Sequence, residues 1–186
     1  MGLIRRVIGV DPGTAVCGFG IVERGPRGIR YLAAGTIRTR RAQGAAMRLR
    51  TIHERLLGVI DQHAPDAMSL ERSFVAANIQ SAFRLGEARA MAILAAAQRG
   101  LALFEYAPNE AKLSVAAYGH ADKQQVKFMV RQTLKLDEAM ELADDATDAL
   151  ALALCHLTRS RIALAAIPAP RRGARRAGRA PAMVSS

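Results

Sequence analysis

The chain has 186 residues, a length typical of one domain, and its 51% apolar and 23% charged residues are typical of a globular protein rather than of a disordered or disulfide-rich chain. Its 27 lysines and arginines outnumber its 16 aspartates and glutamates, and the net charge of +11 favours a polyanionic partner such as nucleic acid. The longest uncharged runs have eleven residues, which excludes a membrane span of roughly 20 residues.

The first forty residues predict a meander of three antiparallel strands. Apolar and β-branched residues cluster at Arg6–Val10, Cys17–Glu23 and Ile29–Thr39. The segments between them, 11–14 and 24–28, have the glycine and proline content of short turns that join hairpins.

Helical periodicity replaces the strand pattern from Ala45 onward. A helix that ends at Pro65 is predicted, with a buried face formed by Leu49, Ile52, Leu56 and Ile60. A short apolar strand at Ala67–Glu71 comes next. The following long helix, Asn78–Arg99, should carry one apolar stripe made of Ile79, Phe83, Gly86, Ala90, Ile93 and Ala97. Its small residues leave a shallow surface that another helix could approach, either within the chain or across a dimer.

The next segment combines a strand at Leu101–Ala107 with a short helix near Asn109–Ala117. Asp122, with Gln125 three residues later, predicts the start of another helix. The core face of this helix should consist of Val126, Met129, Val130, Thr133 and Leu134. A basic row recurs every four residues on another face, at Lys123, Lys127, Arg131 and Lys135.

The last helix is predicted over Asp145–Ala165. After Pro168 the residues bury too little apolar surface to fold alone, so we expect one folded domain at 1–167 and a disordered basic tail at 168–186. Cys17 and Cys155 are isolated and lack the spacing of zinc or redox motifs. Reduced cysteines and the absence of a signal-peptide core predict a cytoplasmic protein.

Together these elements predict an α/β fold with a mixed five-stranded sheet, three antiparallel strands followed by two parallel ones, flanked by helices. A crossover connection places the fourth strand parallel to the first and beside it. Asp11 closes the first of these strands and Glu71 closes the fourth, so both carboxylates should lie at one edge of the sheet. Asp145 and Asp148 share one face in the first turn of the final helix.

If that turn lies against the strand ends, four carboxylates converge, and their repulsion of roughly 1–4 kcal/mol per pair favours bound cations. Ligation by oxygen alone selects Mg²⁺, with Mn²⁺ as a substitute. Two such ions can activate water and stabilise the leaving oxygen of a phosphodiester. An acidic metal pocket in a basic protein therefore predicts a nuclease.

Each acid also has a structural interpretation. Asp11 lies in the common turn sequence Asp-Pro-Gly-Thr, and Glu71 could pair with Arg72. Asp145 and Asp148 could stabilise a helix N-terminus through its dipole. Asp144 is four residues before Asp148 and is interpreted as a capping or flanking residue. The metal interpretation is preferred because the topology brings the acids together.

Three segments of the sequence, Val7–Thr14, Leu70–Asn78 and Asp145–Ala151, resemble the RuvC family of Holliday-junction resolvases, in order and at the family's spacing over about residues 5–160. The resemblance implies a ribonuclease-H-like fold and a homodimer. It also implies Mg²⁺-dependent cutting of symmetric phosphodiester bonds at four-way DNA junctions, in recombination and repair. The family's metal ligands, which also serve in catalysis, match Asp11, Glu71, Asp145 and Asp148.

The resemblance further implies contacts with DNA. Phe74 matches an aromatic residue that can stack on an unpaired base, although a core position is its simplest interpretation. Lys112 and Lys123 match lysines that face the DNA. Arg72, Lys127 and Arg131 complete the predicted DNA-binding residues, and Arg72 departs from the smaller polar residue of many members. A RuvA–RuvB branch-migration complex is the implied protein partner.

Three alternatives remain open at this point. The segment Asp11-Pro12-Gly13-Thr14 also resembles the first phosphate loop of sugar kinases and actin-like ATPases, although a single lobe would not enclose a nucleotide. A small ribonuclease-H-like nuclease acting on RNA is the second alternative, and a basic binding module with inert acids is the third. The four histidines do not cluster, and His156 is expected to be a hydrogen-bonded core residue rather than a metal ligand.

Overall fold

The computed structural model describes residues 4–72, 79–116 and 119–165. Alternating apolar residues in the first forty positions form three antiparallel strands, β1 (Arg6–Asp11), β2 (Val16–Gly25) and β3 (Gly28–Arg38). Each strand is slightly longer than predicted or shifted by a residue, and Asp11 is the last residue of β1 rather than part of the turn.

Two parallel strands complete the sheet. β4 (Ala67–Glu71) pairs with β1, and β5 (Ala102–Tyr106) pairs with β4, so the strand order is β3-β2-β1-β4-β5. The predicted mixed five-stranded sheet is confirmed. Because β1 and β4 run in the same direction, their C-terminal residues meet at one edge of the sheet.

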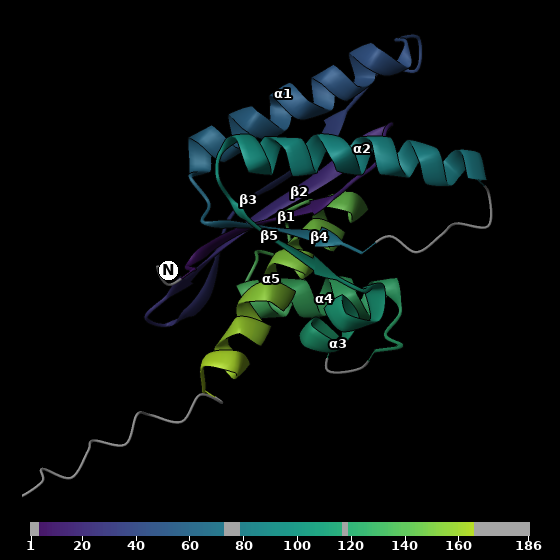
Figure 1. The fold of residues 1–186 in the computed structure, drawn as a ribbon. Coiled ribbons are helices and arrows are strands. Elements are labelled where there is room, and N and C mark those ends of the chain that lie inside the picture. The colour runs from purple at the N-terminus through teal and green to yellow at the C-terminus, as the bar shows by residue number, and fades with distance from the viewer. Residues whose placement is uncertain (1–3, 73–78, 117–118, 166–186) are drawn as a thin grey trace, which may run out of the picture.

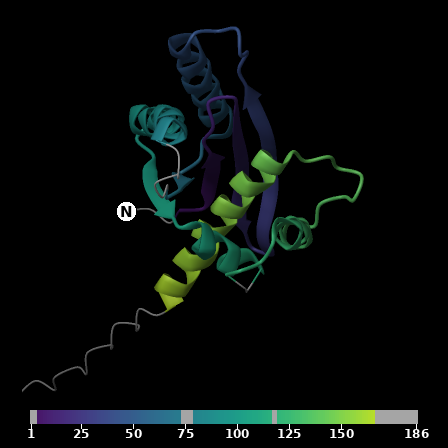
Figure 2. The ribbon, with the colours of Figure 1, turned by 90° about the vertical axis from the view of Figure 1, so that its right-hand side faces the viewer.

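Helices cover both faces of the sheet (Figures 1 and 2). α1 (Ala45–His63) and α2 (Ile79–Gln98) lie on one face, and α3 (Pro108–Ala116), α4 (Lys123–Leu134) and α5 (Asp144–Ala165) lie on the other. The sheet therefore has a core on each side. Ile8, Ile21 and Leu56 are fully buried in the first core, and Val7, Leu150 and Leu157 in the second.

The apolar stripe predicted for α2 lies mostly on the exposed face of the helix. The residues that α2 buries are the alanines Ala88, Ala92, Ala95 and Ala96. Ile79 and Phe83 are 70% and 71% exposed. Short alanine side chains let the helix lie close to its neighbours, and periodicity alone cannot tell which of two apolar faces is buried. Ile93 of the predicted stripe packs against the core, whereas its other members are exposed.

The prediction for α4 is confirmed in its main features. Asp122 accepts a hydrogen bond from the backbone N–H of Gln125, and the Gln125 side chain accepts one from the Asp122 N–H, which forms the predicted capping box. Val126, Val130 and Leu134 are buried. The prediction of Thr133 as a core residue is wrong. Thr133 is exposed, because it lies at the edge of the helix face that is buried.

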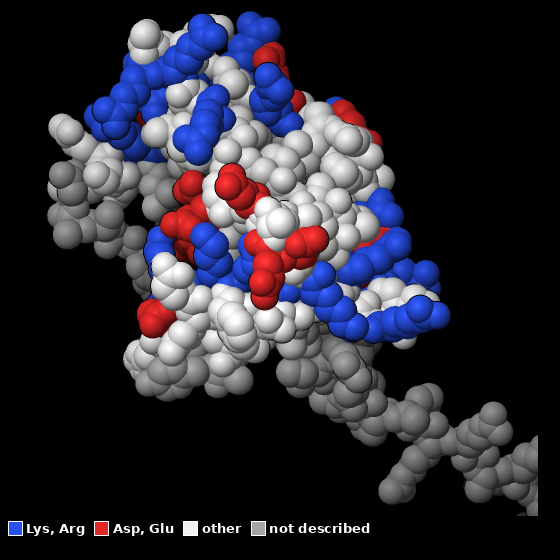
Figure 3. Space-filling model, turned by 180° about the vertical axis from the view of Figure 1, so that it is seen from behind, with Lys and Arg blue, Asp and Glu red and all other residues white. Residues whose placement is uncertain are grey.

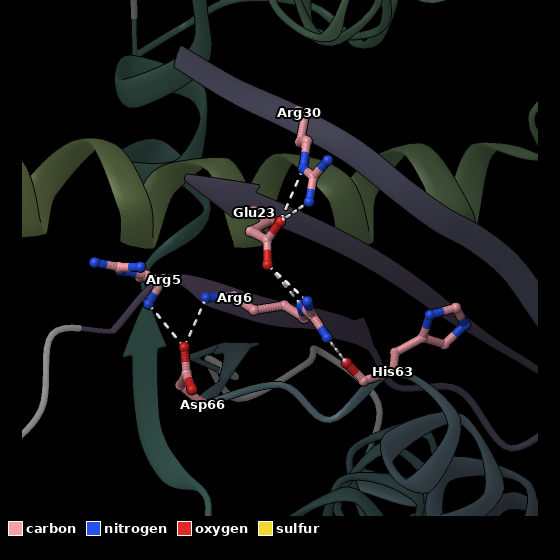
Figure 4. Close-up of polar contacts among 6 residues, drawn as sticks. All are labelled: Arg5, Arg6, Glu23, Arg30, His63 and Asp66. Carbon is pink, nitrogen blue, oxygen red and sulfur yellow. Dashed lines mark hydrogen bonds and ion pairs between the residues drawn. The ribbon is translucent and has the colours of Figure 1, made fainter. Parts of the chain in front are cut away.

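A polar cluster holds together the end of the sheet where β1 begins (Figure 4). One carboxylate oxygen of Asp66 accepts hydrogen bonds of 2.8 Å from the backbone N–H groups of Arg5 and Arg6. Glu23 forms ion pairs with Arg6 and Arg30, and Arg6 also donates to the carbonyl of His63. These contacts fix the register of β1 against β4, and hence the positions of the residues at its other end.

None of the helices in the described residues is long and apolar enough to cross a membrane. The predicted tail at 168–186 lies outside the described residues.

Candidate active site

Strand alternation directs Asp11 and Glu71 to the same face of the sheet. Val7 faces the core on the α5 side, and Asp11 follows it at an even spacing along β1. On β4, Ser69 donates a 2.9 Å hydrogen bond to the carbonyl of Leu152 on α5, and Glu71 is two residues further. Since Val10 is paired with Leu70, the two acids occupy neighbouring positions at the strand ends.

Glycines bring the first turns of α5 onto the sheet. A Cβ atom on Gly9 would lie 1.9 Å from the carbonyl oxygen of Ala149, and one on Gly18 would lie 2.0 Å from that of Asp145. A side chain at either position would push the helix away and carry Asp145 and Asp148 with it. These glycines are absent from the predicted site residues, although glycine at inward positions of adjacent strands indicates that another part of the backbone approaches closely.

The acids open into a cavity of about 380 Å³, which we call the acid pocket. Asp11, Glu71 and Asp148 line it, and Lys112 and Lys123 stand among them. Its other lining residues are Pro108, Ala111, Val126, Ala151 and Leu152. Asp145 is half-buried at the margin and does not line the cavity. The structure therefore brings three of the four predicted acids into one pocket and leaves the fourth beside it.

Burial and mutual repulsion perturb these carboxyls. Burial raises the pKa of Asp11 to about 7, with further increases from the negative charges of Asp148, Glu71 and Asp145. The pKa of Glu71 is also raised, by burial first and by Asp148 second. Burial is the largest cause of the raised pKa of Asp148. Crowded acids of this kind favour protons or cations over an empty site.

The two predicted DNA-facing lysines lie in the acid pocket itself. Lys123 Nζ is 3.8 Å from Asp148 Oδ2, and its charge lowers the pKa of Asp11, Glu71 and Asp148. Lys112 acts in the same direction on Glu71 and Asp148. Lys112 is on α3 and Lys123 is at the start of α4. Both helices pack beside α5, which brings the two lysines close to the acids.

The acid pocket has the chemistry of a site for a hard cation, since its donors are carboxylate oxygens. As the side chains lie in this structure, however, the described residues contain no three acidic, histidine or cysteine side chains arranged to hold one ion. Burial is the main cause of the raised pKa of Asp11, and the negative charges of Asp148, Glu71 and Asp145 add to it. Metal binding by these acids therefore requires rotation of side chains toward a common point.

Asp144 does not belong to the pocket. It begins α5, its side chain is 72% exposed, and its carboxylate accepts a 3.2 Å hydrogen bond from Lys127 Nζ. This position agrees with its interpretation as a flanking residue.

The other residues predicted to contact DNA lie outside the acid pocket or outside the described residues. Arg72 is exposed and its guanidinium lies 3.5 Å from the carbonyl of Glu105. Arg131 donates to the carbonyls of Met140, Asp137 and Glu138, so it also holds the segment that leads into α5. Phe74 lies outside the described residues. Binding of DNA by Arg72, Lys127 and Arg131 stays a prediction.

His156 is a core residue, as expected, and is 3% exposed. Its Nδ1 lies 2.8 Å from the hydroxyl of Tyr106, whereas its Nε2 has no hydrogen-bond partner in the described part of the chain. Cys17 and Cys155 are both buried free thiols.

Comparisons with known proteins identify the family of this chain. The family model for crossover junction endodeoxyribonuclease RuvC matches residues 7–156. The RuvC proteins of Hydrogenovibrio crunogenus and Thermotoga maritima are 44% and 42% identical to this chain over 84% of its length, and the matches cover 89% and 92% of those proteins. The structure of T. thermophilus RuvC in complex with a Holliday junction substrate is 33% identical, with a TM-score of 0.79 over 86% of this chain and 96% of that one. The chain belongs to the RuvC family of crossover junction endodeoxyribonucleases.

Proposed function

We propose that this protein cuts four-way DNA junctions during recombination and repair, with Asp11, Glu71, Asp145 and Asp148 as its metal-binding catalytic residues. The observation that carries this proposal is the acid pocket, which collects acids from β1, β4 and α5 between two lysines. Family membership supplies the class of reaction, and the junction in the T. thermophilus complex supplies the class of substrate.

Mg²⁺ is the proposed cofactor, at two ions per site, with Mn²⁺ as a functional substitute. When bound, such ions activate a water molecule and neutralise charge on the leaving oxygen. Asp11 is central to the site because the charges of the other three acids all act on it. Binding of the ions displaces protons from the raised-pKa carboxyls, so the site loads more completely as pH rises.

The protein's own contribution is to position the scissile phosphate. Lys112 and Lys123 lie where their ammonium groups can bind its non-bridging oxygens. The apolar walls formed by Val126, Ala151 and Leu152 reduce access of bulk water and strengthen these charge interactions. Attack by water forms a new P–O bond and breaks the P–O3′ bond, which leaves a 5′-phosphate and a 3′-hydroxyl that a ligase can rejoin.

Symmetric cutting of a junction needs two active sites, and we propose that a homodimer supplies them. The exposed stripe on α2 that contains Ile79 and Phe83 is the surface on which we place this contact. Phe74 is proposed to stack on a base at the crossover. A RuvA–RuvB branch-migration complex is the proposed protein partner, and the cytoplasm the proposed location.

One assay tests the function. A synthetic four-way junction, a linear DNA duplex and an RNA–DNA hybrid are each incubated with the protein in Mg²⁺ or in EDTA. We expect paired, symmetric cuts in the junction with Mg²⁺ only. Preferential cutting of the hybrid would instead favour a ribonuclease, and ATP hydrolysis without junction cleavage would favour the ATPase alternative.

A further inference from the structure

A second hollow lies at the opposite end of the β1–β2 pair from the acid pocket. Arg6 pairs with Glu23 at that end, whereas Asp11 pairs with Gly18 at the active-site end. The hollow has a volume of about 590 Å³ and lies between the β2–β3 turn, the residue before β1 and the C-terminal end of α4. We call it the hairpin cleft.

The hairpin cleft carries an uncompensated positive charge. Its charged lining residues are five cations and one acid, namely Arg5, Arg24, Arg27, Arg30, Lys135 and Glu23. Glu23 is already held by Arg6 and Arg30. Arg24 donates to the carbonyl of Leu157. Within the described residues, the side chains of Arg5, Arg27 and Lys135 have no ion pair, so these three cations are available to an anionic partner.

Helix α4 connects this cleft with the active site. Lys123 and Val126 near its start line the acid pocket, and Leu134 and Lys135 at its end line the hairpin cleft. At about 1.5 Å per residue, Lys123 and Lys135 lie about 18 Å apart along the helix axis. Lys127 and Arg131 lie between them. Figure 3 shows one face of the molecule, where acidic side chains gather near the middle and lysines and arginines lie around them.

We propose that the hairpin cleft binds the sugar-phosphate backbone of one junction arm while the acid pocket holds the scissile phosphate of the same arm. This inference rests on the proposed function. Duplex DNA advances about 3.4 Å per base pair, so 18 Å corresponds to about five base pairs. Arg27 and Lys135 therefore contact phosphates about five base pairs from the cut.

The chemistry of the cleft favours a nucleic-acid backbone over other anions. An acidic peptide would also match its charge, but a duplex bound at the acid pocket would in addition lie along α4, the helix that begins at the pocket and ends at the cleft. The apolar lining residues are Pro26, Ile29 and Leu134, and the charged side chains around them outnumber them, which suits an extended polyanion.

The test is a thermodynamic cycle between protein cations and DNA charges. Junctions are made with or without neutral methylphosphonate linkages at positions four to six from the cleavage site, and their dissociation constants are measured in EDTA. The cleft variant is Arg27→Ala with Lys135→Asn, because Lys135 has a φ of 51°, which asparagine tolerates better than alanine. The matched control is Arg38→Ala with Arg55→Ala, which removes two exposed cations beside a different hollow.

We expect neutral linkages to weaken binding by the native protein and by the control about tenfold, and to have little further effect on the cleft variant. The slope of log K against log salt for the unmodified junction should fall by about 2 in the cleft variant, because two counterion-releasing contacts are lost. Arg27→Lys with Lys135→Arg should restore both effects.

If the neutral linkages weaken binding equally in the cleft variant and in the native protein, the inference is wrong. The same result is expected if the cleft binds an acidic protein instead of DNA. Thermal unfolding of each variant shows whether the fold is retained. Junction cleavage by the native protein in Mg²⁺, measured in parallel, separates failure of this inference from failure of the proposed function.

Discussion

Lys123 Nζ lies 3.8 Å from Asp148 Oδ2, so a cation from the start of α4 stands in the pocket where acids of three elements meet. This charge lowers the pKa of Asp11, Glu71 and Asp148, in opposition to burial, which raises all three. Lys123 therefore favours ionisation of these acids, in addition to its proposed contact with phosphate.

Lys123→Ala tests this double role. Without the lysine the carboxyl pKa values rise further, so the acidic limb of the cleavage profile should move to higher pH. The slope of log K against log salt for junction binding should also fall by about 1, because one fewer counterion is released. Cleavage rates between pH 5.5 and 9 give the first result. Lys127→Ala is the control, because Lys127 pairs with Asp144 outside the pocket; an acidic limb that moves equally in both variants, or in neither, would contradict the assignment.

Asp11→Asn should abolish junction cleavage and retain junction binding, since the change removes a proposed metal ligand but leaves both lysines. We expect a loss greater than the roughly 100-fold typical of residues that only orient metal ligands. Glu71→Gln should behave alike. Gel-shift binding and single-turnover cleavage measure the two properties, with Asp144→Asn as an active control because Asp144 is 72% exposed and outside the pocket. Native-like cutting by Asp11→Asn would exclude its catalytic role.

The metal-free protein should lose stability as pH rises from 5 to 8. Burial raises the pKa of Asp11 in the folded state from its ordinary value of 3.8 to about 7, so the folded state retains a proton that the unfolded state has lost. This contribution is complete at low pH and is lost as pH rises through about 7. After allowance for the partial exposure of Asp11, we expect the Asp11→Asn substitution to make the loss of unfolding free energy between pH 5 and 8 smaller by about 2 kcal/mol.

Urea unfolding in EDTA at the two pH values measures this difference. Added Mg²⁺ should restore stability to the native protein at pH 8 and have a smaller effect on the Asp11→Asn variant. Identical pH dependence of the two proteins would show that the Asp11 carboxyl is not crowded.

Gly9→Ala should destabilise the protein by about 3 kcal/mol, because the new methyl group would overlap the backbone of α5 at Ala149. Gly58→Ala on α1 is the matched control, since nothing lies within 4 Å of its added Cβ and the helix gains stability of about 0.5–1 kcal/mol. Chemical denaturation of the two variants gives the comparison. Equal stability would mean that α5 does not need direct contact with the sheet backbone.

Local sequence patterns predicted much of this arrangement. The clustered apolar residues of the strands and the capping residues Asp122 and Gln125 indicated the elements that carry the site. Asp11 and Glu71 could be placed together because parallel strands end at the same edge of a sheet. The side of α2 that is buried could not be predicted, because alanines on one face and Ile79 and Phe83 on the other give two apolar stripes of similar period.

Residue type and spacing were enough to predict the order of the elements, the excess of positive charge and the acids available to a metal site. The positions of Lys112 and Lys123 inside the acid pocket, of Asp145 at its margin, and of α4 between the pocket and the hairpin cleft follow only from the folded structure. The positions of Asp145 and Asp148 depend on how closely α5 packs on the sheet. That distance is set by contacts between residues far apart in the chain, such as Gly9 and Ala149.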